Sequence, residues 1–169
     1  MNRIRFVAWI VALALLGGFL VACWPTDQRK VARQTRAFLN AVAKNGPESL
    51  PVSAARAYEA ASHVGPELTL RLGDPFPARL TKSEFTSLLQ QVRGRADRLD
   101  MKSRGVEIHR QEDGMLVDVT LEATVALQGR RESMIGTYRL LWVRMDTAWR
   151  LTRVEALNVI QHPQATSWW

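Results

Sequence analysis

The feature that most constrains the fold is a long alternation of apolar and polar residues between positions 115 and 127. One set of alternate positions is apolar and consists of Met115, Val117, Val119, Leu121, Ala123, Val125 and Leu127. The positions between them include Asp118, Thr120, Glu122 and Thr124. Successive side chains of a β-strand point to opposite faces of its sheet. The run therefore predicts a long strand in a sheet that is covered on one face only.

Other strands are expected on both sides of this run. The predicted strands cover residues 67–72, 76–80, 106–110, 133–145 and 149–157. The first two are separated by Gly73-Asp74-Pro75, which is typical of a turn. In the last strand the apolar positions change parity between Leu151 and Val154, which predicts a bulge or a strong bend.

Three helices are expected in addition to the strands. The first begins at Thr26-Asp27, carries Val31, Thr35, Phe38, Leu39 and Val42 on one face, and ends at Lys44-Asn45-Gly46-Pro47. The second covers residues 53–62. The third opens with a capping box at Thr81 and Glu84. Its apolar stripe consists of Phe85, Leu88, Leu89, Val92 and Ala96.

The order of these elements resembles that of the NTF2-like superfamily, which includes SnoaL-like proteins. The resemblance covers about residues 27–157 and includes the closing pair formed by residues 138–142 and 149–154. It implies an α+β fold, a cone of three N-terminal helices packed on a strongly bent, mainly antiparallel sheet. A generic α+β sandwich is the alternative. The residues that carry the resemblance are mostly structural, so it predicts fold better than activity.

The N-terminal segment predicts attachment to a membrane. Residues 6–24 contain no charge and follow Arg3 and Arg5, which is the layout of a secretory signal or a membrane anchor. The positive start directs everything after it to the outside. Leu20-Val21-Ala22-Cys23 resembles the bacterial lipobox, which implies a lipid on Cys23. An uncleaved anchor helix in which Cys23 is merely buried is the alternative.

These observations predict a signal peptide or anchor over residues 1–23, an NTF2-like domain over 26–158 and a tail over 159–169. The expected location is the cell envelope, with the domain outside the cytoplasm on the periplasmic side.

Composition excludes several classes of site. The single cysteine excludes an intramolecular disulfide, and the sequence has no Cys/His cluster with zinc spacing. No metal or cofactor is therefore expected. Without Arg3 and Arg5, 21 basic residues still exceed 16 acidic ones, which suits an anionic membrane surface or a nucleic acid. Nucleic acid is not expected, because no aromatic residues interleave the basic ones.

No catalytic residue is predicted. Enzymes of the resembled superfamily place acids or a histidine inside the cone. Asp118 and Glu122 lie on the polar face of their strand, where a solvated outer surface is expected. Arg144-Met145-Asp146 leads into a turn. The histidines are His63, His109 and His162, and the sequence provides no evident carboxylate partner for any of them.

Aromatic side chains are the candidate binding residues. Tyr58, Phe76, Tyr138, Trp142 and Trp149 are expected either to line a pocket for an apolar ligand or to fill the core. Arg139 could bind a ligand carboxylate if it points inward, although an outward orientation is favoured. A basic stretch consists of Arg93, Arg95, Arg98, Lys102 and Arg104. It is interpreted as a solvated face or as a surface for anionic headgroups.

The leading hypothesis is a membrane-tethered, non-catalytic domain that binds an apolar small ligand or an envelope protein. The first alternative is an assembly domain that resembles the periplasmic assembly proteins of type IV secretion systems. The second is a SnoaL-like enzyme with an unrecognised acid in its pocket. Because NTF2-like domains often pair through their sheets, a homodimer through the sheet is one expected arrangement.

Overall fold

The computed structural model describes residues 27–73, 76–127 and 130–161. The chain divides into one unit of residues 1–30 and a second of residues 31–169. Cys23, the predicted leader and His162 lie outside the described residues. None of the helices among the residues described has the length and apolar character needed to cross a membrane.

Three helices form where the sequence predicts them. They are α2 (Asp27–Val42), α3 (Leu50–Ser62) and α4 (Lys82–Arg95). The capping box of α4 is confirmed: the Thr81 hydroxyl accepts a hydrogen bond from the Glu84 amide at 3.3 Å, and the Glu84 carboxylate accepts one from the Thr81 amide at 2.7 Å. α3 begins three residues earlier than predicted because Pro51 suits the first turn of a helix.

Six strands form one sheet in the order β2-β1-β6-β5-β4-β3. Their bounds are β1 (Val64–Arg71), β2 (Arg79–Thr81), β3 (Arg98–Gln111), β4 (Gly114–Leu127), β5 (Arg130–Met145) and β6 (Ala148–Gln161). Neighbouring strands are antiparallel except β1 and β6, which are parallel. The predicted α+β architecture is thus present, with a mixed sheet that is mainly antiparallel.

Two strand predictions are corrected. The second short strand covers Arg79–Thr81 rather than residues 76–80. Phe76 instead donates its amide to the Gly73 carbonyl at 3.1 Å in a turn, and Pro77 has no amide to contribute to a strand ladder. β3 extends from Arg98 to Gln111, far beyond residues 106–110. The added residues are too polar to show an apolar alternation, but they pair with β4 throughout.

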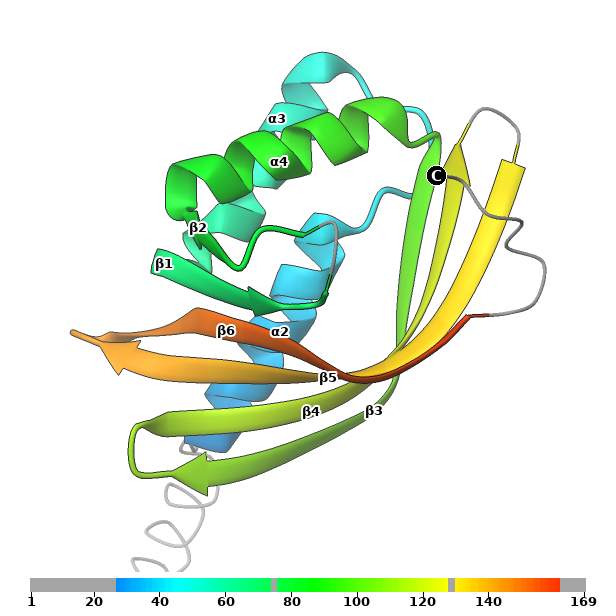
Figure 1. Ribbon diagram of the computed structural model, residues 1–169. Helices are drawn as coiled ribbons and strands as arrows, with labels where there is room; N and C mark the ends of the chain where they lie inside the picture. Colours follow the sequence, from blue (N-terminus) through cyan, green and yellow to red (C-terminus); the bar gives the residue numbers. More distant parts are fainter. Residues whose placement is uncertain (1–26, 74–75, 128–129, 162–169) are drawn as a thin grey trace, which may run out of the picture. The chain divides into compact units, whose positions relative to one another are not determined.

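The sheet is strongly curved, as Figure 1 shows for the long strands β3, β4 and β5. The pairing of β5 with β6 is irregular at Thr152. Leu141 pairs with Arg153 and Trp142 pairs with Leu151, so Thr152 is an additional residue in β6. This confirms the bend predicted between Leu151 and Val154. Further irregularities lie in β6 between Ala156 and Asn158, and in β3 between Ser103 and Gly105. Bulges of this kind bend a strand and increase its twist.

The curvature also explains why the alternation along β4 is not kept to its end. Val117 and Val119 are fully buried, as expected from the pattern. Beyond Leu121, however, Thr124 is buried and Leu127 is 44% exposed, which reverses the prediction for this end of the strand. The irregularity in β3 is opposite Thr120 and Leu121, so the sheet changes direction where the alternation breaks.

The helices pack on the concave side of the sheet, and α3 lies along α4 (Figure 1). The core is a single cluster of residues from both layers, including Val31, Phe38, Ala57, Leu68, Leu89, Val117, Leu140, Trp142 and Leu151. Gly114 begins β4 close to the backbone of Trp142, and a Cβ there would overlap the Trp142 carbonyl oxygen. Only glycine fits at that position.

Candidate functional site

The two carboxylates of the long alternating strand lie on the outer face of the sheet. Asp118 accepts two hydrogen bonds of 2.8 Å from the guanidinium group of Arg139. These bonds hold the pKa of Asp118 below its usual value. Glu122 accepts two from Arg104, at 3.0 and 2.6 Å. Arg139 therefore points outward and is bound to a carboxylate of its own chain.

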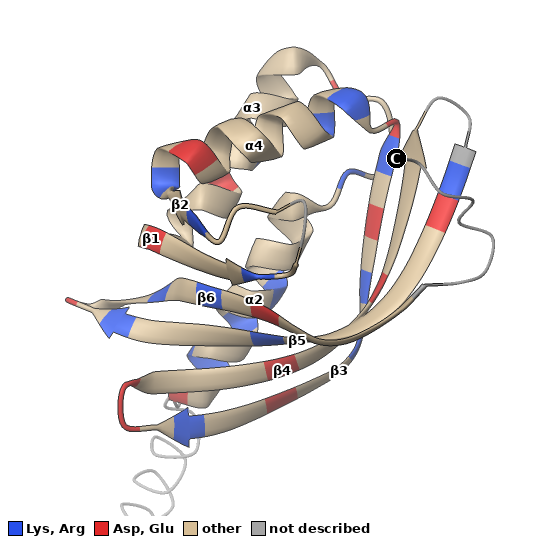
Figure 2. Ribbon diagram, in the orientation of Figure 1, with Lys and Arg blue, Asp and Glu red and all other residues tan. Residues whose placement is uncertain are grey.

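Asp118 and Arg139 belong to a row of charges that crosses five strands. Register pairs Glu107 with Asp118, Asp118 with Arg139, and Arg139 with Glu155. Arg71 of β1 is opposite Glu155 at 3.8 Å. Figure 2 shows acidic and basic positions together on these strands. Asp118 and Glu155 on this face thus each have an arginine of a neighbouring strand as an ion-pair partner.

The two described histidines do not form an acid–base pair with an interior carboxylate. His63 ends α3 and lies edge-on to Trp142, with ring centroids 6.5 Å apart. Its partial burial lowers the pKa of its imidazole, so the neutral form is favoured. His109 is exposed on β3, 3.8 Å from Glu107. Neither arrangement has the geometry of a catalytic dyad.

The five aromatic residues predicted to line a pocket do not come together. Trp142 is completely buried and Trp149 is 8% exposed, and both belong to the core. Tyr138 packs against that core, and burial raises the pKa of its hydroxyl. Tyr58 and Phe76 are 65% and 50% exposed, on α3 and in the turn before β2. Core filling thus accounts for the three aromatic residues on β5 and β6.

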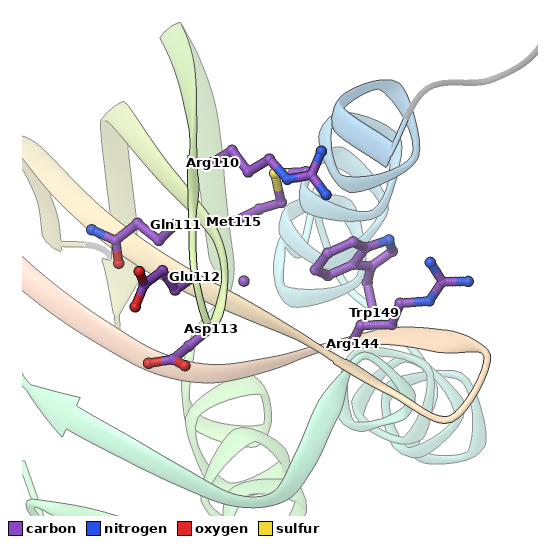
Figure 3. Close-up of a pocket in the computed structure, with 8 residues that line it drawn as sticks. Arg110, Gln111, Glu112, Asp113, Met115, Arg144 and Trp149 are labelled. Atoms are coloured by element: carbon purple, nitrogen blue, oxygen red, sulfur yellow. The ribbon is translucent and has the colours of Figure 1, made fainter.

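A pocket of about 250 Å³ lies at the ends of the β3–β4 and β5–β6 hairpins. Its lining consists of Arg110, Gln111, Glu112, Asp113, Gly114, Met115, Arg144 and Trp149. Figure 3 shows Arg110, Met115 and Trp149 on the side of the strands where the helices lie, and Gln111, Glu112 and Asp113 on the other side. Of the five aromatic residues predicted to line a pocket, Trp149 is the one in this lining. The many charged groups make the pocket unsuitable for an apolar ligand.

In the Arg144-Met145-Asp146 segment, Arg144 and Met145 end β5, and Asp146 lies in the turn that leads to β6. Asp146 has a φ of 54°, a left-handed conformation that aspartate tolerates better than most residues. The segment therefore serves the hairpin, as the sequence predicts.

Sequence reasoning missed a pair of buried cations at the ends of α2 and α4. The guanidinium group of Arg93 is completely buried and donates to the carbonyl oxygens of Ala41, Val42 and Ala43 at 2.7–3.0 Å. It also contacts the carboxylate of Glu48 at 2.5 Å. The carbonyls belong to the C-terminal end of α2, where the helix dipole is negative.

Lys44 makes the reciprocal contact. Lys44 follows α2 in the sequence. Its ammonium group donates to the carbonyl oxygens of Arg93 and Ala96 at the C-terminal end of α4, at 2.8 and 2.6 Å. Its backbone also pairs with that of Leu99 at the start of β3. We refer to Lys44, Glu48 and Arg93 as the cation clasp. Arg93, which lies on α4, thus caps the C-terminal end of α2, and Lys44, which follows α2, caps the C-terminal end of α4.

The clasp corrects two predictions. Val92 is 39% exposed and Arg93 takes its place in the buried stripe of α4. Arg93 is therefore not part of a solvated basic stretch. A signal was present, because Arg93 follows Leu89 by four residues and precedes Ala96 by three, so all three share one face of the helix.

The C-terminal half of β6 is an apolar strand edge. β1 pairs with β6 only as far as Glu155, so residues 156–161 have β5 as their one neighbour among the described strands. Leu157, Val159 and Ile160 in this segment are 43%, 39% and 61% exposed. We call residues 156–160 the open edge of β6. An open strand edge with exposed apolar side chains is a place where another chain can pair.

Comparison with known proteins supports the fold. No protein-family model matches the sequence, and the curated proteins likewise provide no match. A scytalone dehydratase-like protein from Novosphingobium aromaticivorans superposes with a TM-score of 0.63 at 13% identity, over 80% of this chain and 87% of that one. A dehydratase-like protein of the NTF2-like family from Streptomyces avermitilis gives 0.59 at 13% identity, over 77% and 94%.

A third structure comes from Xanthomonas campestris and resembles a calcium/calmodulin dependent protein kinase II association domain. It superposes with a TM-score of 0.60 at 10% identity, over 83% of this chain and 91% of that one. Identities this low establish architecture alone, and the names of these neighbours include both enzymes and an association domain. Residues 31–161 therefore have the NTF2-like fold.

Proposed function

We propose that this protein is a membrane-tethered, non-catalytic NTF2-like domain of the cell envelope, and that it binds a protein partner. The proposal that the domain is non-catalytic rests on the position of the two strand carboxylates, Asp118 and Glu122. Asp118 and Glu122 lie on the outer face, each held by an arginine, and the inner face opposite them is apolar.

The interior also argues for a protein partner over an apolar small ligand. Trp142, Trp149 and Tyr138 are the aromatic residues best placed to line a cavity, and they pack into the core or against it. The charged pocket at the hairpin ends is a poor match for an apolar molecule.

The open edge of β6 is the surface on which the partner would bind. An extended segment of another protein could add to this edge through main-chain hydrogen bonds, and its apolar side chains could contact Leu157, Val159 and Ile160. The same edge would serve an assembly domain such as those of secretion systems, and it would also serve a second copy of this chain.

The tether rests on Arg3, Arg5, the uncharged run 6–24 and Cys23. Mass spectrometry of the full chain purified from bacterial membranes tests it. A diacylated N-terminal Cys23 is expected. An intact Met1 would replace the lipid by an uncleaved anchor, and a soluble, unmodified chain would overturn tethering.

Site-specific photocrosslinking tests partner binding. A photoreactive residue at Ile160 is expected to capture a discrete envelope protein, or a second copy of this chain, in living cells. The matched control is Tyr58, which is equally exposed but lies on α3. Identical crosslinking patterns from the two positions would overturn the assignment of the open edge.

The enzyme hypothesis is tested separately. Asp118→Asn and Glu122→Gln remove the two strand carboxylates without changing their size. If the domain acts through binding alone, cells that carry either variant retain the wild-type phenotype. A variant that folds but does not support the wild-type phenotype would instead favour the hypothesis of a SnoaL-like enzyme.

A further inference from the structure

Helix α2 has an exposed stripe of basic residues. Its buried face carries Val31, Thr35, Phe38 and Leu39. The opposite face carries Arg29, Arg33 and Arg36 at helical spacing, with Lys30 beside them, and all four are exposed. Asp27 is the single acid in the helix. α2 therefore presents an excess of positive charge along one side, and blue segments mark it in Figure 2.

Arg33 and Arg36 differ from the arginines of the sheet. Arg139 and Arg104 are bound by Asp118 and Glu122, whereas none of the described residues forms an ion pair with Arg33 or Arg36.

The basic stretch after α4 is a weaker candidate for an anionic surface than α2. Arg93 is buried in the cation clasp, Arg98 lies 3.5 Å from Asp100, and Arg104 is bound to Glu122. Three of its five cations thus already have partners within the fold. On α2, the charges of Arg33 and Arg36 are not paired with any acid of the described residues.

The stripe is also close in sequence to the predicted attachment point. Asp27 follows Cys23 by four positions, and an extended chain spans at most about 3.6 Å per position, or about 14 Å in all. Arg33 lies six residues further along a helix that rises 1.5 Å per residue, or about 9 Å. A lipid on Cys23 would therefore hold Arg33 within about 25 Å of the membrane surface.

We infer that the basic stripe of α2 binds the anionic lipid headgroups of the leaflet that holds the N-terminus. This inference rests on the proposed tethering. The tether supplies attachment, and the stripe fixes the orientation of the domain by placing one side of α2 on the membrane. Anionic headgroups match the stripe because they present many negative charges on one plane.

Arginine footprinting of the full chain tests this inference. The protein is reconstituted into vesicles of phosphatidylcholine alone or with phosphatidylglycerol, and exposed arginines are modified with phenylglyoxal and located by mass spectrometry. Arg33 and Arg36 are expected to react at least about fivefold more slowly with phosphatidylglycerol present. Arg79, exposed on β2, is the internal control and should react equally in both.

High salt provides a second criterion, since about 1 M salt shortens the screening length to about 3 Å. Protection of Arg33 and Arg36 should then disappear. A matched pair of variants completes the design: Arg33→Glu/Arg36→Glu reverses the stripe, and Arg79→Glu/Arg95→Glu makes the same change of charge at exposed positions elsewhere. Only the first should make the phenylglyoxal reactivity of Arg29, which both variants retain, independent of phosphatidylglycerol.

Flotation separates failure of the inference from failure of tethering. In one outcome the protein floats with neutral vesicles at high salt, and Arg33 and Arg36 react equally in both kinds of vesicle. This result would overturn lipid binding by the stripe and leave the tether intact. Protection without flotation on neutral vesicles would overturn the tether and support the stripe. Protection by an acidic envelope protein, without any effect of phosphatidylglycerol, would assign the stripe to that protein and overturn the lipid inference.

Discussion

Two groups of cations lie on or next to helix α2, and they behave differently. At its C-terminal end, Arg93 and Lys44 are buried among backbone carbonyls and the carboxylate of Glu48. Along its outer side, Arg33 and Arg36 are exposed and lack an ion pair within the described residues. The first group is part of the fold, and the second is available to a partner. A basic residue in a sequence therefore indicates little until the groups that surround it are known.

The largest effect is expected for Arg93→Met. The variant leaves three carbonyl oxygens and the partly buried Glu48 carboxylate without their donor. Breaking a buried ion pair in this way costs about 3–5 kcal/mol in the free energy of unfolding. Urea denaturation measures it. Arg95→Met, two residues along the same helix and exposed, is the control, and equal losses in both variants would refute the structural role of the clasp.

Lys44→Met is expected to cost less. It removes two hydrogen bonds from an ammonium group to the carbonyls of α4 and leaves no carboxylate without its partner, whereas Arg93→Met removes bonds to three carbonyls and to the Glu48 carboxylate. Lys102→Met on β3 is the exposed control. Since Lys44 binds the backbone of Arg93 itself, the double variant should lose less than the sum of the single losses. Strict additivity would show that the two cations act separately.

Asp118→Asn tests an intermediate case, a cation that is paired but partly exposed. Arg139 lowers the pKa of Asp118, so the pair stabilises the fold above the unfolded pKa of about 3.9 and ceases to do so as the pH falls through the lower folded pKa. The variant should be less stable than the wild type at neutral pH, by less than the clasp variants. This difference should shrink below about pH 4. A constant difference across the acid range would contradict the proposed cause.

The smallest effect on stability is expected for Arg33→Gln/Arg36→Gln. Exposed side chains away from buried features change the free energy of unfolding by no more than about 0.5 kcal/mol. The same variant should abolish the difference between neutral and anionic vesicles in the phenylglyoxal reactivity of Arg29, the arginine of the stripe that it retains. A large loss of stability would place these arginines with the clasp and remove the contrast between the two groups.

Local patterns predicted much of the architecture. The apolar alternation of β4, the amphipathic face of α2, the capping box of α4 and the parity change in β6 all depend on neighbours within a few residues. The family resemblance then supplied the order of layers. The helices and most of the strands were accordingly predictable from the sequence.

Features that depend on distant partners were not predictable. Residues 98–105 of β3 lack an apolar alternation and become a strand because β4 pairs with them. Arg93 is buried because Glu48 and the end of α2 surround it, and these lie about 50 positions away in sequence. The aromatic candidates failed to come together for the same reason, since exposure of Tyr58 depends on how α3 meets its neighbours. Sequence spacing places Arg93 on the same face of its helix as Leu89 and Ala96, but it does not show which distant groups surround its side chain.

The cation clasp has a consequence for the continuity of the chain. It joins residues 44–48 to residues 93–99, so the segment between them, which contains α3, β1, β2 and most of α4, begins and ends at one place. A single peptide cleavage inside that segment would leave both fragments attached at this junction, and each would also retain its contacts with the sheet. The domain should accordingly survive nicking there as one non-covalently associated particle, whereas cleavage in an Arg93→Met variant should release its pieces more readily.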